Sequence, residues 1–105
     1  MQSDRKEPEL TTTMELSGFI HGHEYRQMNQ SQKESYVTGV IDGLMFAFAV
    51  TKQTSSQQRL EECIKNVPVN QLTAIITKYI TTNPESLQTT ASGLVFNALV
   101  SPSNR

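Results

Sequence analysis

The sequence contains no tryptophan, a single cysteine and no long hydrophobic run. With Cys63 alone, an intramolecular disulfide is excluded, so packing has to hold the fold together. The longest apolar run, Gly43 to Val50, is far shorter than the roughly 20 residues that a membrane-spanning helix requires. We therefore expect no membrane insertion and predict that this run belongs to the protein core.

Net charge is also nearly absent. Nine basic and ten acidic residues give a formal charge of −1 over 105 residues, which creates no global field to attract nucleic acid or an anionic membrane. We therefore expect no nucleic-acid partner. From Asn66 onward the only charged residues are Lys78, Glu85 and Arg105, and such a weakly charged half is a plausible surface for self-association or partner contact.

The chain is long enough for one domain of a few helices that needs no metal or cofactor. Residues 1–15 are charged and Thr-rich without apolar periodicity, so we interpret them as a flexible leader before a single helical domain over 16–105. The leader has no apolar core of the kind found in a signal peptide. The protein is therefore either cytoplasmic or the processed form of an exported chain.

The sequence after the leader predicts helices. Apolar residues predict a short helix near 18–28, and the S-x-x-E pattern at 31–34 predicts a capping box that starts a longer helix over about 32–51. This second helix is apolar nearly all round, as in a central buried helix. Gly39 and Gly43 would let another backbone approach it closely, and Asp42, if buried there, should accept hydrogen bonds.

The second half alternates polar connections with apolar stripes. Residues 51–58 are polar and predict an exposed loop. A short helix around Leu60 ends before Pro68, and helical spacing predicts another helix over 69–81. Asn83-Pro84-Glu85 predicts the start of a last helix that runs to about 99. The expected fold is all-α, a compact single domain of four to five helices with a central buried helix.

Two ordered blocks of residues carry a family resemblance. The first is S17-G-F-I-H-G-H-E-Y-R-Q-M28 followed by Y36-V-T-G-V-I-D-G43, and the second comprises Cys63, Q71-L72, Y79 and N83-P84-E85. In this order they resemble the Rap/Tai family of type VI secretion immunity proteins, over most of residues 17–100. The positions in these blocks that we interpret as structural are Tyr36, Gly39, Asp42, Gly43, Tyr79 and Pro84.

The resemblance implies a compact all-α domain, usually exported to the periplasm, that neutralises a cell-wall amidase delivered by a competing cell. Members bind and do not catalyse, and the fold transfers more readily than the immunity role. This chain departs from the family in having one cysteine, where many members have a pair, and in having no visible export signal.

Two groups of residues suggest a metal site or a catalytic nucleophile, but only weakly. His21, His23 and Glu24 lie close in sequence and could supply metal ligands, but the spacing of paired ligands on one helix face is absent, so surface or capping roles are favoured. Cys63 follows two glutamates that would raise the pKa of its thiol, which favours a structural thiol over a nucleophile. No catalytic residue, metal ligand or cofactor site is therefore assigned.

The leading hypothesis is a non-catalytic protein-binding domain that blocks the active site of a peptidoglycan amidase and forms a homodimer through its weakly charged face. The alternative is a periplasmic helical protein with a structural or stress-related role and no toxin partner. Binding residues favour loops on rigid scaffolds, so the predicted contact is the 51–58 connection, comprising Lys52, Gln53, Thr54, Ser55, Ser56, Gln57 and Gln58.

Overall fold

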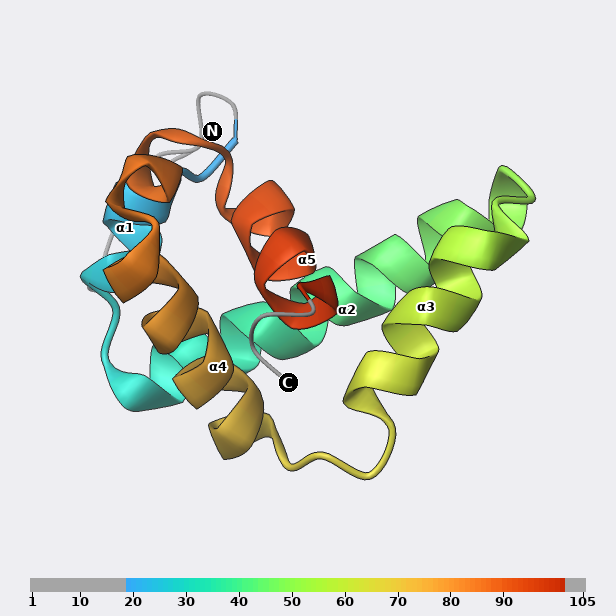
Figure 1. The fold of residues 1–105 in the computed structure, drawn as a ribbon, viewed down its shortest axis with the longest axis horizontal. Coiled ribbons are helices and arrows are strands. Elements are labelled where there is room, and N and C mark those ends of the chain that lie inside the picture. Colours follow the sequence, from blue (N-terminus) through green and yellow to red (C-terminus); the bar gives the residue numbers. More distant parts are fainter. Residues whose placement is uncertain (1–18, 102–105) are drawn as a thin grey trace, which may run out of the picture.

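The computed structural model describes residues 19–101. The expected leader over residues 1–15 lies outside them. This part of the chain folds into five α-helices and one 3₁₀-helix and contains no strand, which confirms the all-α prediction (Figure 1). In chain order the elements are α1 (Gly22–Arg26), α2 (Gln30–Val50), α3 (Thr54–Ile64), α4 (Val69–Thr82), η1 (Pro84–Gln88) and α5 (Ala91–Val100).

Helix α2 begins earlier than predicted because a different residue caps it. The Asn29 carboxamide oxygen accepts a hydrogen bond from the Gln32 amide (2.8 Å), and the Gln32 side chain accepts one from the Asn29 amide (2.9 Å). This is the reciprocal pairing of a capping box, two residues before the Ser31–Glu34 box that the sequence predicted. Ser31 therefore lies inside the first turn.

The sequence predicted the start of α4 correctly but not the start of α3. Helix α4 spans Val69–Thr82, close to the predicted 69–81, and Pro68 precedes it as its N-cap. The predicted loop over 51–58 is wrong for most of its length, because α3 already begins at Thr54. The connection between α2 and α3 is therefore a turn of three residues.

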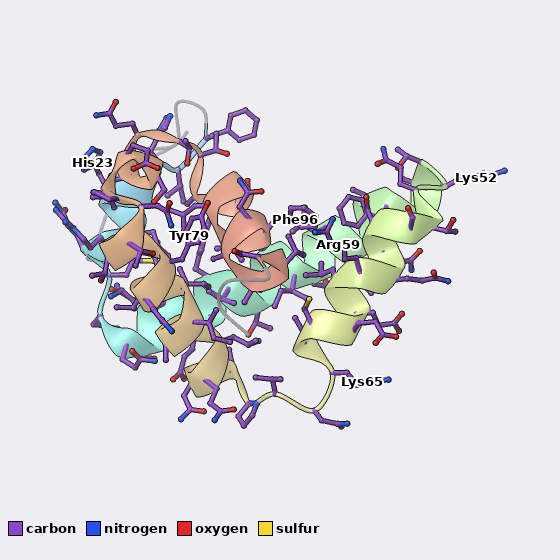
Figure 2. All side chains as sticks on the ribbon, in the orientation of Figure 1. His23, Lys52, Arg59, Lys65, Tyr79 and Phe96 are labelled. Carbon is purple, nitrogen blue, oxygen red and sulfur yellow. The ribbon has the colours of Figure 1, made fainter. Side chains whose placement is uncertain are left out.

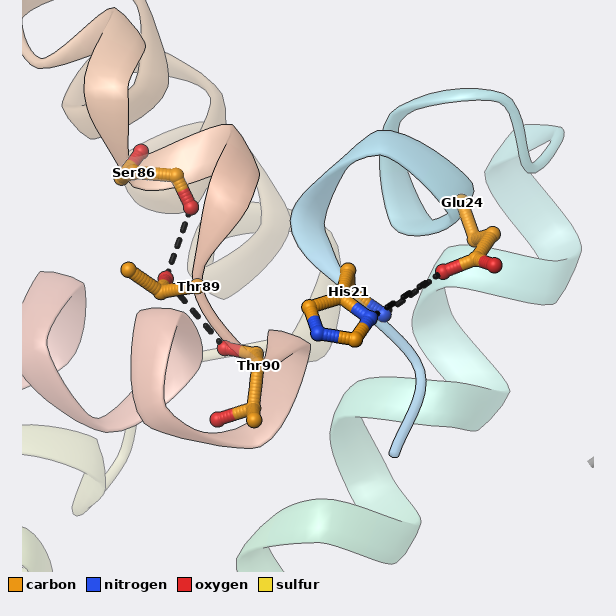
Figure 3. Close-up of polar contacts among 5 residues, drawn as sticks. All are labelled: His21, Glu24, Ser86, Thr89 and Thr90. Carbon is orange, nitrogen blue, oxygen red and sulfur yellow. Dashed lines mark hydrogen bonds and ion pairs between the residues drawn. The ribbon is translucent and has the colours of Figure 1, made fainter. Parts of the chain in front are cut away.

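The predicted last helix is interrupted. Pro84 does begin a helical segment, but this segment is the short η1, and α5 starts separately after Thr90. The Thr90 hydroxyl accepts a hydrogen bond from the Gly93 amide (3.3 Å), and the Thr89 hydroxyl donates to the Ser86 carbonyl (2.7 Å), as Figure 3 shows for the latter pair. Threonine hydroxyls that bond nearby backbone favour such breaks and caps over a continuous helix.

Backbone hydrogen bonds to residues 20 and 22 also stabilise this break between η1 and α5. The Gly22 amide donates to the Thr89 carbonyl (3.0 Å), and the Ala91 amide donates to the Ile20 carbonyl (2.6 Å). These bonds form an isolated antiparallel bridge between His21 and Thr90. They place α1 against η1, at the end of the molecule away from the α2–α3 turn (Figure 1).

The fold has a central buried helix, but it is α5 and not α2. Helix α5 contacts α1, α2, α3, α4 and η1, and half of its ten residues are buried. In α2 only Val37 is buried. The core comprises Tyr25, Val37, Leu60, Leu72, Ile76, Ile80, Leu87, Ala91, Leu94, Val95, Ala98 and Leu99.

The expected close packing around α2 is wrong. Gly39 and Gly43 are exposed, and a Cβ atom added at either position would meet no atom within 4 Å. Asp42 is exposed as well, so its carboxylate is solvated and needs no buried hydrogen-bond partner. The apolar residues of α2 are spread around the helix, and only those on one side reach the core.

The glycine that does permit a close approach is Gly22. A Cβ atom there would lie 2.7 Å from the Leu87 Cα and 2.9 Å from the Leu94 Cδ1, distances shorter than van der Waals contact. Gly22 therefore allows α1 to pack directly on the backbone of η1, which the sequence pattern did not indicate.

Candidate functional site

The α2–α3 hairpin extends away from the rest of the helices and ends in a tight turn (Figure 1). At this turn the Gln53 amide donates to the Phe48 carbonyl (2.8 Å) and the Lys52 amide donates to the Ala49 carbonyl (3.2 Å). Lys52 has a positive φ of 59°. Together these features form a Schellman motif, in which a left-handed residue ends a helix and two amides satisfy its last carbonyls.

The turn is therefore well ordered by hydrogen bonds. The Thr51 hydroxyl adds a bond to the Ala47 carbonyl (2.7 Å), and the Gln57 amide donates to the Gln53 carbonyl (3.1 Å) at the start of α3. We call residues 51–55 the hairpin tip. All five are exposed, and the Lys52 side chain projects from the end of the molecule into solvent (Figure 2).

The remaining residues of the predicted binding segment lie on the first turns of α3. Ser56 and Gln57 are half-buried and Gln58 is exposed. The sequence did not indicate a helix here because Ser and Thr compete with helical hydrogen bonds. The useful signal was the spacing of Gln57, Leu60 and Ile64, which places these three residues on one face toward the core side of the hairpin.

An apolar stripe leads along α2 to the hairpin tip. Phe46 and Val50 are 70% and 59% exposed, and with Gly39 and Gly43 they recur at spacings of four, three and four residues on one side of the helix. We call these four residues the outward stripe. Phe46 and Val50 lie one turn apart and form an exposed apolar pair beside the hairpin turn, so the stripe is a candidate contact surface.

The other residues singled out in the sequence lie elsewhere. Tyr36 is half-buried on α2, and its ring lies 5.9 Å from that of Tyr25. Tyr79 is half-buried on α4, where its carbonyl accepts a bond from the Asn83 side chain (3.1 Å). Pro84 is exposed at the first position of η1. These residues are therefore not brought together with the hairpin tip.

The His21, His23 and Glu24 group is at the opposite end from the tip (Figure 2). The Glu24 carboxylate accepts a hydrogen bond from the His21 amide (2.7 Å) and lies 3.9 Å from the His21 ring nitrogen (Figure 3). This pairing caps α1. Within residues 19–101 no three potential ligands gather around a common point. Cys63 is free and half-buried on α3.

A model of the Rap1a immunity proteins matches residues 8–102, which is nearly the whole chain. The chain belongs to the Rap1a immunity protein family. Neither the curated proteins nor the solved structures contain a significant match. The family model covers every helix described above, and the two sequence blocks that carry the resemblance lie mainly on α1 and α2 and on α4 and η1.

Membership of the Rap1a family directs attention to surfaces that suit a protein partner. No helix within the described residues is long and apolar enough to cross a membrane. The hairpin tip and the outward stripe together offer a rigid, mixed polar and apolar surface at one end of the molecule. This surface combines exposed apolar side chains with hydrogen-bonding ones, the two kinds of group that protein interfaces contain.

Proposed function

We propose that this Rap1a-family chain is a type VI secretion immunity protein that binds a peptidoglycan amidase in the periplasm and performs no catalysis of its own. The observation that supports the proposal is the hairpin tip, an ordered and fully exposed element that projects from a protein of an immunity family. The alternative, a structural or stress-related role without a toxin partner, has no such element to support it.

The tip is suited to occlusion of a cleft. Because its backbone is fixed by the Schellman motif, little conformational entropy is lost when it inserts between the walls of an active site. Lys52 and Gln53 then donate hydrogen bonds to acceptors in the cleft. Substrate is excluded by volume, so inhibition needs no chemical step.

The test is the substitution Lys52→Gly, measured with a purified peptidoglycan amidase effector. Glycine adopts a positive φ freely, so the turn persists while the side chain is lost. We expect affinity by calorimetry to fall at least about tenfold, equivalent to 1.4 kcal/mol, with amidase inhibition reduced in parallel and helical content unchanged.

Lys65→Ala is the matched control, because Lys65 is an exposed cation at the far end of the same hairpin. It should leave affinity unchanged. Equal, small effects of both substitutions would show that the tip is not the recognition element. If neither variant nor the parent chain bound any amidase, the structural alternative would be favoured instead.

We further propose that the chain forms a homodimer through the outward stripe. An antiparallel two-fold pairing centred midway along the stripe places Gly39 opposite Val50 of the other copy and Gly43 opposite its Phe46. Each large side chain then faces a glycine, which is the self-complementarity that an isologous interface needs. This location differs from the weakly charged half that the sequence suggested.

The two locations are separated by Phe46→Asp and Gln71→Asp. Both residues are exposed, and Gln71 lies on α4 within the weakly charged half. We expect Phe46→Asp to give a monomer in sedimentation velocity at tens of micromolar, because it places a charge in the interface core, whereas Gln71→Asp leaves the dimer intact. The reverse result would assign dimerisation to the weakly charged half, and a monomeric parent chain would rule out both.

A further inference from the structure

A second surface at the opposite end of the molecule has the shape of a small cleft. It has a volume of about 250 Å³ and lies where α1, α2, α4 and η1 meet. Drug-sized ligands and cofactors occupy roughly 300–1,000 Å³, so this cleft is too small for them. Its size suits one or two side chains of a macromolecular partner.

The walls of the cleft carry positive charge and no acid. Arg26 and Lys33 line it, together with the polar Thr77 and Thr81 and an apolar floor that includes Ile80 and Leu87. The only ion pair within residues 19–101 joins His21 and Glu24, so neither Arg26 nor Lys33 is neutralised by a carboxylate of this part of the chain. We call this cavity the basic cleft.

A contact with an aromatic ring fixes the position of the Lys33 side chain. Its Nζ atom lies 5.7 Å from the centre of the buried Tyr25 ring, a distance at which the ring attracts a cation. Lys33 is therefore held at the wall of the cleft. Its remaining N–H donors are available to an acceptor in the cavity, because a contact with the ring face leaves most of the ammonium group uncovered.

Hydrogen bonds engage several carbonyls near the end of α4. The hydroxyls of Thr81 and Thr82 donate to the Thr77 and Lys78 carbonyls, and the Tyr79 carbonyl accepts from the side chain and the backbone amide of Asn83. The charged side chains that line the cleft are the two cations, Arg26 and Lys33.

A shallower cavity of about 450 Å³ adjoins the basic cleft at Thr77, a residue that both share. Its floor is fixed by Gln30, whose side-chain amide donates to the Glu34 carboxylate and to the Thr73 hydroxyl, both at 2.9 Å. The two cavities together follow α4 from Asn70 to Thr81, a helical rise of about 16 Å. Roughly five residues of an extended chain span that length, and the basic cleft continues beyond it to Pro84 of η1.

We propose that this groove binds an extended segment of a partner protein, with a glutamate side chain of that segment in the basic cleft. The methylene groups of the glutamate lie on Ile80 and Leu87, and its carboxylate accepts charge-assisted hydrogen bonds from Arg26 and Lys33. Glu34 at the other end of the groove favours a basic residue of the same segment. The direction of the bound chain is thereby fixed.

This contact is separate from the hairpin tip, so its test does not depend on an amidase. The probes are two capped hexapeptides, one with leucine and glutamate near one end and lysine near the other, and a second in which glutamine replaces the glutamate. Binding to the full chain is followed by heteronuclear NMR. We expect the glutamate peptide to shift the amides of Arg26, Thr77 and Thr81 and to bind about tenfold more tightly than the glutamine peptide.

The variants Arg26→Gln and Lys33→Gln should each remove most of that preference, whereas Lys78→Gln should not, because Lys78 is an exposed cation of α4 that does not line the cleft. Equal binding of the two peptides would overturn the proposal. So would competition by inorganic phosphate as strong as that by the glutamate peptide, because the cleft would then be a general anion site. Unchanged helical circular dichroism checks that each variant is folded.

Discussion

Gly22→Ala is expected to lower the free energy of unfolding by about 1–3 kcal/mol, the usual cost of overpacking a filled site. The added Cβ would lie 2.7 Å from the Leu87 Cα. A backbone atom cannot rotate away as a side chain can, so α1 has to separate from η1. In a domain of this size the melting temperature should fall by several degrees per kcal/mol, measured by circular dichroism.

Gly39→Ala provides the matched comparison. The site is helical and open, so alanine should raise the free energy of unfolding by about 0.5–1 kcal/mol through its helix propensity. The measurement belongs at dilutions where the chain is monomeric. If alanine at position 22 were as well tolerated as at position 39, the direct packing of α1 on η1 would be contradicted.

The second large effect is expected at Tyr25, whose side chain has no exposed surface. Tyr25→Ala should cost about 3–5 kcal/mol, as for other large buried aromatic residues. Tyr25→Phe should cost far less, because the Tyr25 hydroxyl has no hydrogen-bond partner among the described residues and phenylalanine keeps the ring that contacts Tyr36. Urea unfolding of the three chains measures the difference.

Tyr25 also predicts a pH dependence. Burial, and secondarily the neighbouring Tyr36, raises the pKa of Tyr25 from 10.0 to about 12. The folded state then holds its proton more tightly than the unfolded state, so the contribution to stability is complete below pH 10 and is lost as the pH rises from about 10 to 12. Tyr25→Phe should make stability less dependent on pH in that window. An equally steep loss would assign the alkaline transition to other groups.

Helix positions were predictable where apolar spacing and proline agreed, as in α4. Helix ends were less predictable, because several polar residues can cap a helix. Asn29 and Ser31 are both suited to the N-cap position, and in the structure Asn29 forms the capping box with Gln32. Burial was least predictable. Phe46 and Val50 were predicted to lie in the core, yet both side chains are exposed. No local pattern reveals which side of an apolar helix is covered.

The exposure of part of the predicted binding segment was predictable, but its conformation was not. The polar composition of residues 51–58 indicated exposure, and residues 51–55 are exposed. The Schellman motif was not predictable, because Lys52 occupies a position where glycine is usual. The basic cleft was missed altogether. Arg26, Lys33 and Thr77 come from three helices, and they meet only because α1 packs on η1 while α2 and η1 both pack on α4.

The bridge between Ile20–Gly22 and Thr89–Ala91 has a consequence for the order of folding. Its partners are about 70 positions apart, and closing a loop of that length costs roughly 4 kcal/mol of chain entropy. The α2–α3 hairpin closes through three residues and can form at once. We expect the α1 end to join last and to open first. A molecule that has lost this end for a moment therefore still presents an intact hairpin tip to its partner.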